Sequence, residues 1–251
     1  MSGYAELALV RGMSFLADQQ SAIANNLANA ATNTYKRRTS IAQQVTSEFE
    51  SLLRVPLPSV AYREQIAFAR GIERPTGEDM NVSIGAASSF FRVTDSDNRT
   101  YLTRVGELGV DSEGFLSTRS GNRYLDSTGE PISLAGATSI AISSNGVISG
   151  TATDEDGRTT ETEFGTVAAY AVPAPERLRP VGQSLYRDDV GQEVALDAAP
   201  GIRQGFLEQS NVDSLQELVS MIVVQREFQA TTRALTTIGR IQETYVSAMN
   251  R

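Results

Sequence analysis

The chain has 251 residues, with 22 basic and 30 acidic side chains and a formal net charge of −8, and it contains no cysteine and no histidine. Without cysteine there can be no disulfide, thiolate nucleophile or cysteine-bound zinc, and without histidine there is no Ser-His-Asp triad. The acidic balance argues against a nucleic-acid ligand, which is bound by clustered Lys and Arg.

The dense basic run of the sequence is Lys36-Arg37-Arg38. We interpret it as the solvated C-terminal cap of a helix, where cations complement the helix dipole. No apolar stretch approaches the roughly 18 residues of a membrane span, so we expect no membrane insertion. The N-terminus also lacks the basic and apolar regions of a cleaved secretory signal. We therefore expect a chain that stays in the cytoplasm or is exported without such a signal.

Residues 1–34 are predicted to form one helix. Its apolar side chains recur in alternate steps of four and three, a heptad seam interrupted by Gln20. The pattern fits an amphipathic helix packed on its own domain as well as it fits a coiled coil. The seam comprises Leu9, Met13, Leu16, Ile23, Leu27 and Ala30.

Residues 35–80 are predicted to be a linker or extended segment. Ile41–Arg54 has the composition of a helix, whereas Pro56, Pro58 and Pro75 enforce extended chain.

Residues 81–205 are predicted to form a β domain of short antiparallel strands, because glycines are dense and apolar residues alternate. Strands are expected at 101–105, 115–118, 166–170 and 192–196. Asn145-Gly146 inside residues 140–148 predicts a hairpin with a type I′ turn, in which both positions have positive φ. Further turns are expected at 111–114, 127–129 and 156–157.

Residues 206–251 are predicted to form a second long helix, with Asn211 or Asp213 as its N-cap. Its seam also steps by three and four, and Leu215, Leu218 and Ile222 widen it at the start. The seam comprises Met221, Val224, Phe228, Thr231, Leu235, Ile238, Gln242, Tyr245 and Met249.

The predicted fold class is therefore α+β. The N- and C-terminal helices pair as an antiparallel coiled coil, with a central, mainly antiparallel β domain. Any apolar seam that this pair leaves exposed would be a surface for association with other chains.

Three regions of the sequence, one near each end and one between them, resemble the flagellar rod and hook protein family. Asn25–Lys36 is similar to the family pattern N-N-L-A-N-x-x-T-x-G-F/Y-K, with Thr34 in the place of glycine. The segments 205–212 and 217–228 resemble the C-terminal motif of the family. Tyr101–Gly106 resembles its Y-T-R-x-G with one inserted residue. Phe90-Phe91 also fits the family, although the flanking glycines are replaced by Ala87 and Ser89.

The resemblance implies a structural subunit of the bacterial flagellar basal-body rod, not an enzyme, without a cofactor or metal. It implies helical polymerisation through the terminal helices into a torque-transmitting hollow shaft. Its partners would be itself, other rod subunits and the flagellar type III export apparatus, and its location the periplasmic rod of the basal body. The length suits a proximal or distal rod subunit, and the short segment after residue 40 favours a proximal one.

The expected assembly interface combines seam residues with polar residues of the two motifs. Asn25, Asn26 and Asn29 are expected to hydrogen-bond across helices of neighbouring subunits, as a buried Asn fixes coiled-coil register. The alternative for these three residues is a solvated helix end. The full set is Leu16, Ile23, Asn25, Asn26, Leu27, Asn29, Ser210, Asn211, Val212, Leu218, Met221, Ile222, Gln225, Arg226, Phe228, Leu235 and Ile238.

Two further interpretations were weighed against this one. Calcium could be bound by Asp95, Asp97 and Asn98 or by Asp154, Asp156 and Gly157, but neither segment has the donors of a complete EF-hand loop, and a turn is simpler. A carbohydrate-binding or peptidoglycan-acting β domain between oligomerising helices is the alternative function.

Overall fold

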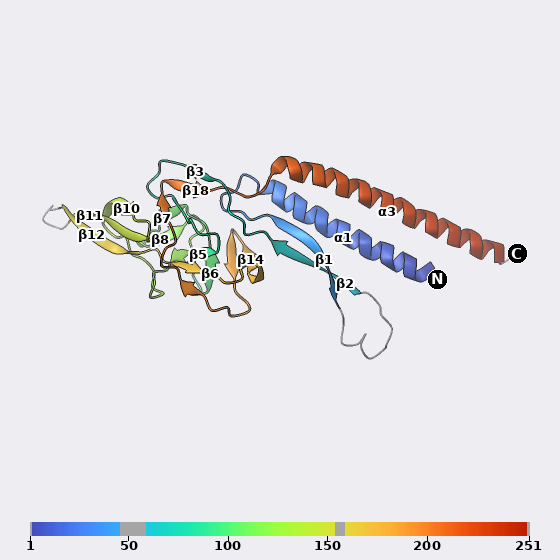
Figure 1. Ribbon diagram of the computed structural model, residues 1–251, viewed down its shortest axis with the longest axis horizontal. Coiled ribbons are helices and arrows are strands. Elements are labelled where there is room, and N and C mark those ends of the chain that lie inside the picture. The colour runs from blue at the N-terminus through green and yellow to red at the C-terminus, as the bar shows by residue number, and fades with distance from the viewer. Residues whose placement is uncertain (1, 46–58, 154–158, 250–251) are drawn as a thin grey trace. The chain divides into compact units, whose positions relative to one another are not determined.

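The computed structural model describes residues 2–45, 59–153 and 159–249, and this part of the chain is an α+β protein with two long helices (Figure 1). The chain divides into two compact units. Unit 1 comprises residues 1–30, 37–67 and 212–251, and unit 2 comprises residues 31–36 and 68–211.

Unit 1 contains the two helices, α1 (Ser2–Ala28) and α3 (Ser214–Met249), and a β-hairpin. The helices lie side by side and run in opposite directions (Figure 1). Leu16 and Ile23 of α1 form a buried cluster with Val224 of α3, and Met221 and Phe228 pack against it. The predicted seam of α3 is buried or half-buried as far as Gln242. The two terminal seams therefore meet, as the periodicity predicts.

The N-terminal helix ends six residues earlier than predicted, at Ala28. Turns follow, and Thr34 has a φ of 60°. That left-handed conformation is unfavourable for a β-branched residue and cannot continue a helix. Thr34 occupies the position where the family pattern has glycine. Glycine is preferred there because it adopts a positive φ without steric cost.

Residues 41–45, the described part of the helix considered for Ile41–Arg54, form a strand of a β-hairpin instead, and residues 46–54 lie outside the described ranges. Strand β1 (Arg38–Val45) pairs antiparallel with β2 (Ser59–Ile66), from Arg38 opposite Ile66 to Val45 opposite Ser59. Residues 41–45 form their backbone hydrogen bonds with β2 instead of within a helix. Pairing with a distant strand therefore outweighs the local helix propensity. Pro56 and Pro58 lie outside the described residues.

Unit 2 contains the remaining strands and a short 3₁₀-helix, η1 (Pro175–Arg177). All strand pairs in the described ranges are antiparallel, which confirms the mainly antiparallel β region. The strands are β3 (Glu73–Pro75), β4 (Val82–Ser83), β5 (Ser89–Thr94), β6 (Thr100–Thr103), β7 (Leu108–Val110), β8 (Leu116–Thr118), β9 (Arg123–Tyr124), β10 (Ala137–Ile142), β11 (Val147–Thr153), β12 (Thr159–Thr166), β13 (Ala169–Ala171), β14 (Arg179–Gly182), β15 (Leu185–Arg187), β16 (Ala195–Leu196), β17 (Arg203–Gln204) and β18 (Phe206–Glu208).

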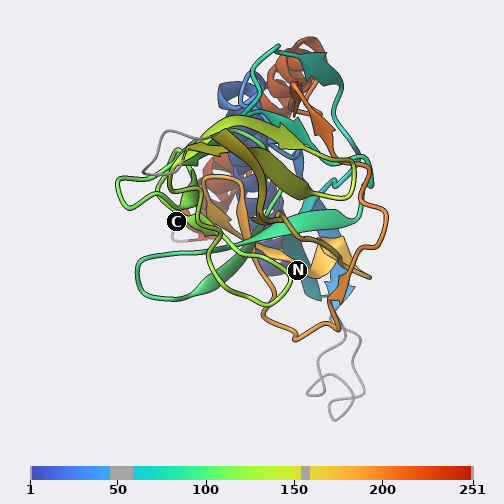
Figure 2. The ribbon, with the colours of Figure 1, turned by 90° about the vertical axis from the view of Figure 1, so that its left-hand side faces the viewer.

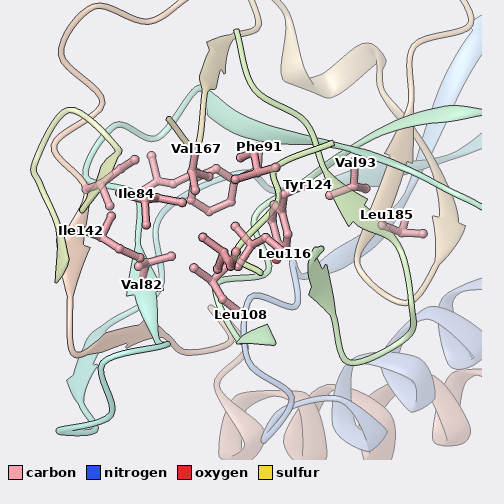
Figure 3. Packing of buried hydrophobic residues seen from close by; sticks show 14 residues of the cluster. Val82, Ile84, Phe91, Val93, Leu108, Leu116, Tyr124, Ile142, Val167 and Leu185 are labelled. Carbon is pink, nitrogen blue, oxygen red and sulfur yellow. The ribbon is translucent and has the colours of Figure 1, made fainter. Parts of the chain in front are cut away.

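The largest sheet of unit 2 has the order β14-β15-β6-β5-β9-β8-β7, with β13 pairing both β5 and β16. Strands β10, β11 and β12 form a separate three-stranded sheet. In Figure 2 the strands of this unit curve around a common interior. Apolar residues from both sheets fill that interior, including Phe91 and Leu116 of the largest sheet and Ile142 of the three-stranded sheet (Figure 3). Phe91, Leu116 and Ile148 are each fully buried.

The hairpin predicted around Asn145-Gly146 forms, because β10 pairs with β11 and Ile142 lies opposite Ile148. The predicted type I′ turn is wrong, since only Gly146 of the dipeptide has a positive φ, at 89°. The Gly146 N–H donates to the carbonyl of Ser143 at 2.9 Å, which makes a four-residue loop. A Cβ at Gly146 would lie 2.3 Å from the carbonyl oxygen of Val167, so the site requires glycine.

The C-terminal helix begins directly after one of its two predicted caps, and the first residues of the predicted segment 206–251 form a strand. Phe206–Glu208 forms β18, paired with β3, and α3 starts at Ser214. Of the two predicted caps, Asp213 is the one observed: its Oδ1 accepts hydrogen bonds from the backbone N–H groups of Leu215 and Gln216 at 3.0 and 3.2 Å.

Candidate assembly interface

A buried charge cluster in unit 2 joins the three segments that resemble the family. Lys36, Arg104 and Glu208 have exposed fractions of 1%, 1% and 2%. Lys36 Nζ lies 2.6 Å from Glu208 Oε1, and Arg104 Nη2 lies 2.8 Å from Glu208 Oε2. One carboxylate thus holds a cation from the N-terminal motif and a cation from the β region.

Backbone groups complete the coordination of this cluster. The Arg104 guanidinium donates to the carbonyls of Ile84, Ala86, Ala87 and Ser89, between 2.6 and 3.2 Å. Lys36 Nζ also donates to the carbonyl of Ala69, and Glu208 Oε1 accepts from the Gly71 N–H. Buried charges are tolerated when they are paired and their remaining hydrogen-bonding capacity is used, which is the case here.

The environment shifts both pKa values downwards. Burial lowers the pKa of the Lys36 ammonium, and the Glu208 charge opposes that shift only in part. For Glu208, burial acts to raise the pKa, but the charges of Arg104 and Lys36 and their hydrogen bonds lower it below its ordinary value. Glu208 is therefore an anion at neutral pH.

The interpretation of Lys36-Arg37-Arg38 as a solvated helix cap is wrong. Helix α1 ends at Ala28, so the run lies beyond it, and each cation has a carboxylate partner. Arg37 Nε lies 2.5 Å from Glu217 Oε1, and Arg38 Nη1 lies 3.2 Å from Glu64 Oε1. The sequence motifs mark Lys36 and Glu208 individually, but only the fold reveals that they are partners.

Asn26 forms a second buried connection, within unit 1, and its side chain is fully buried. Its Oδ1 accepts from the Arg38 N–H at 2.8 Å, and its Nδ2 donates to the Arg38 carbonyl at 2.7 Å. Nδ2 also donates to Glu217 Oε2 at 3.2 Å. The bonds seen for Asn26 thus lie within one chain, whereas we expected partners in a neighbouring subunit.

Asn25 and Asn29 behave differently from Asn26. Asn25 Nδ2 donates to the Ser21 carbonyl at 2.9 Å, and Asn29 Nδ2 donates to the Asn25 carbonyl at 2.8 Å. Both bonds run back four residues to carbonyls in the last turns of α1, and the Asn25 carbonyl also accepts from the Asn29 N–H at 3.1 Å. These two asparagines therefore serve the helix end.

The other expected interface residues fall into three groups. The seam between α1 and α3 contains Leu16, Ile23, Met221, Phe228, Leu235 and Ile238, and Leu27 is half-buried. Ser210, Asn211 and Val212 are half-buried in the segment before α3, where Asn211 Nδ2 donates to the Ala69 carbonyl. Leu218, Ile222, Gln225 and Arg226 are exposed on other sides of α3.

The start of α3 is apolar outside the buried seam as well. Five residues there are about half-exposed or more, and by helical periodicity they point away from the buried Val224. We call them the start patch: Leu215, Leu218, Val219, Ile222 and Val223. Val219 and Val223 lie in the segment 217–228 that resembles the family, but outside the heptad seam and outside the expected interface set.

A cleft of about 390 Å³ in unit 1 borders the start patch. Val219 and Val223 line it together with Ala22 of α1 and Thr39 of β1. Its charged lining residues are Arg37, Arg38, Glu217 and Glu227.

The acidic segment at residues 95–99 is a closed turn. Asp95 Oδ1 accepts from the N–H groups of Asp97 and Arg99, both at 2.9 Å, and Oδ2 pairs with the Arg99 side chain at 3.0 Å. Over the described ranges no group of three or more acidic residues is placed to hold a metal ion. Asp154, Asp156 and Gly157 lie outside those ranges. Neither of the described helices is both long and apolar enough to cross a membrane.

The described residues form a β unit and two long antiparallel helices, one of which has an exposed apolar face, as proteins with association surfaces often do. Comparison with known proteins gives the family. Residues 203–248 match the model described as flagellar basal body rod FlgEFG protein C-terminal, and residues 86–150 match the flagellar hook protein FlgE/F/G D1 domain.

Whole proteins of known name are similar over most of the chain. Flagellar basal-body rod protein FlgG of Bacillus subtilis (strain 168) is 32% identical over 180 residues, which cover 68% of this chain and 66% of that protein. FlgG of Buchnera aphidicola subsp. Acyrthosiphon pisum is 28% identical, over 86% of this chain and 88% of that protein. FlgF of Caulobacter vibrioides is 25% identical, over 91% of each. The chain belongs to the flagellar basal-body rod protein family. It is a family of structural proteins and not of enzymes, which removes the peptidoglycan-acting alternative.

Proposed function

We propose that the chain is a structural subunit of the flagellar basal-body rod and polymerises helically, through α1 and α3, into a torque-transmitting hollow shaft. The observation that carries this proposal is the start patch, an apolar surface on the longest helix that no described part of the chain covers. Exposed apolar clusters of this kind are typical of association surfaces.

The pairing of α1 with α3 is proposed to be an antiparallel coiled coil. Leu16, Ile23, Val224 and Phe228 lie at heptad positions of the two seams and pack together, which supports knobs-into-holes packing. A stiff helical pair suits a shaft, because many desolvated contacts in a fixed register resist twisting.

The names of the relatives and the resemblance of the motifs support the partners and the location. We propose that the partners are other rod subunits, further copies of this chain and the flagellar type III export apparatus, with no nucleic acid and no membrane insertion. The proposed location is the periplasmic part of the basal body, after export without a cleaved signal. Assignment to the proximal rod stays a prediction, as do the assembly roles of residues 1–34 and 206–251.

The test is a matched pair of substitutions in the full chain, expressed in a strain that lacks the native protein. Ile222→Asp places a charge in the start patch, and Val190→Asp places one on an equally exposed valine of unit 2. We expect both variants to be secreted and folded, and only Ile222→Asp to be missing from purified basal bodies. If Ile222→Asp enters complete rods as the native chain does, or if the native chain never fractionates with basal bodies, the proposal is wrong.

A further inference from the structure

Helix α3 carries a second exposed apolar surface near its other end. Ile241 and Tyr245 are 61% and 69% exposed, although Tyr245 continues the predicted seam. They line a shallow hollow of about 380 Å³ together with Ala248, Thr237, Thr244 and Arg240. We call this surface the end patch.

The two patches of one chain cannot meet each other. Val219 and Tyr245 stand 26 positions apart on the same continuous helix. At a rise of 1.5 Å per residue this separation is about 39 Å. The two patches therefore cannot cover each other, and no other described part of the chain buries either of them.

A helical polymer requires this kind of arrangement. A contact between identical patches closes into a dimer, whereas a contact between two different patches of successive copies gives an open helical polymer unless its rotation closes a ring. Resting on the proposed function, we propose that the end patch of one copy docks on the start patch of a second copy of this chain. Ile241 and Tyr245 then enter the cleft beside Val219 and Val223.

The chemistry of the two patches is complementary. A tyrosine with an apolar ring and a polar tip is a typical anchor for a cleft that has apolar walls and a charged rim. The cleft beside the start patch has such walls in Val219 and Val223 and such a rim in Arg38 and Glu227.

The exposed charges at the two patches are also complementary. In two copies related by translation along the helix axis, the α3 helices are parallel. If Tyr245 of one copy lies opposite Val219 of the other, then Arg240 of the first copy lies opposite Ser214 of the second. Asp213, which precedes Ser214, is an exposed carboxylate beside the start patch. Arg240 is likewise exposed, at the rim of the end patch. Arg240 of one copy and Asp213 of the other therefore carry opposite charges, which favours this parallel register.

The absence of native cysteine makes a disulfide test direct. Full-length Val219→Cys and Tyr245→Cys are prepared as single variants, together with the double variant. A disulfide needs Cα atoms within about 7 Å, so an intrachain bond across about 39 Å of helix is impossible. Under mild oxidation of assembled protein we expect the double variant to give a ladder of covalent oligomers. A mixture of the two single variants should give at least tenfold more dimer than either alone.

The control pair is Arg233→Cys with Tyr245→Cys, since Arg233 is exposed on the same helix but outside both patches. Equal crosslinking of this control would overturn the proposal, as would dimers from Val219→Cys alone. It would also be overturned if the chain enters rods while the double variant yields no ladder. Absence of the native chain from basal bodies would instead refute the proposed function.

Discussion

Single residues matter most in this protein where a charge is buried. Glu208 neutralises two cations, and the partner atoms of the cluster belong to segments far apart in the chain. Removing one member of such a set leaves the others as uncompensated charges in a region without water. The cluster is therefore expected to be intolerant of even isosteric changes.

We expect Glu208→Gln to lower the free energy of unfolding of unit 2 by about 3–5 kcal/mol, because Lys36 and Arg104 lose their anion while remaining buried. Glu113→Gln is the matched control, since Glu113 pairs with Arg123 on the surface of the same unit, and it should cost only about 0–1 kcal/mol. Urea unfolding followed by tyrosine fluorescence measures both. Equal effects of the two substitutions would contradict a central role for the cluster.

The lowered pKa of Glu208 also predicts a pH dependence. In acid the unfolded chain binds the Glu208 proton before the folded chain does, so the free energy of unfolding falls as pH falls. The contribution of Glu208 is complete above the ordinary glutamate range and is lost as pH drops through its folded pKa. Unfolding curves between pH 7 and pH 3 should fall more steeply for the native chain than for Glu208→Gln. Parallel curves would show that Glu208 is not the titrating group.

Among the elements, α1, β1 and α3 are held together by one polar contact set and one apolar seam. Asn26 sits between the backbone of Arg38 and the Glu217 carboxylate, so its amide fixes how β1 starts relative to both helices. The seam around Val224 supplies burial without such specificity. The position of β1 relative to the two helices therefore depends on the hydrogen bonds of the Asn26 amide more than on the amount of buried apolar surface.

We expect Asn26→Leu to leave secretion and the fold of unit 2 intact but to impair rod completion and swimming. The substitution leaves the Arg38 backbone groups without their Asn26 partner, at a cost of about 1–3 kcal/mol for each buried group left unsatisfied. Asn25→Leu is the control, because Asn25 is exposed one position earlier in the same helix. Secretion assays, electron microscopy of basal bodies and swimming halos measure the outcome. Normal rods in Asn26→Leu would remove this amide from the assembly mechanism.

Phe228→Ala tests the seam itself. The Phe228 ring packs against the cluster of Leu16, Ile23 and Val224 and is half-buried. We expect the substitution to lower the free energy of unfolding of the helix pair by about 2 kcal/mol, less than the 3–5 kcal/mol that a fully buried Phe costs. Polymerisation should suffer, whereas the melting of unit 2 should not change. Separate near- and far-ultraviolet circular dichroism melts distinguish the units. If the variant assembled normally but unit 2 melted at a lower temperature, the assignment of Phe228 to the seam between α1 and α3 would be wrong.

At the scale of the whole molecule, the two units differ in how completely they bury their apolar residues. Unit 2 encloses a core in which Phe91, Leu116 and Ile148 are inaccessible to solvent. Unit 1 buries a narrow seam and leaves the start and end patches uncovered. An isolated molecule should therefore be stable in unit 2 and only marginally stable in its helices, which gain their burial on assembly.

Hydrogen exchange on dilute, proven monomer measures this difference. Amides of β5, β8 and β11 should be protected towards the limit set by global unfolding, whereas those of Ser2–Ala28 and Ser214–Met249 should exchange orders of magnitude faster. The helices are expected to gain protection in assembled rods. Slow exchange throughout both helices of the monomer would contradict the expectation.

The sequence alone determined the features that arise from short-range geometry. The heptad steps place one side of a helix towards a partner, so the seams of α1 and α3 could be read without coordinates, as could the α+β class and the hairpin at β10 and β11. The motifs identified the family for the same reason, because they are contiguous. Local signals failed at residues 29–34 and at Ile41–Val45. There a residue in the left-handed region and a distant strand partner outweigh helix propensity.

Only the tertiary structure decided which charges and amides meet. Lys36 and Glu208 stand 172 positions apart, and Asn26 and Glu217 stand 191 positions apart, so no spacing rule connects them. Whether Lys36 is a solvated cap or a buried ion depends on the desolvation of the surrounding segments, a property of the packed chain and not of its neighbours in sequence. The exposure of Val219, Val223 and Tyr245 is decided in the same way, because a helix side is buried or bare according to what the rest of the fold lays against it.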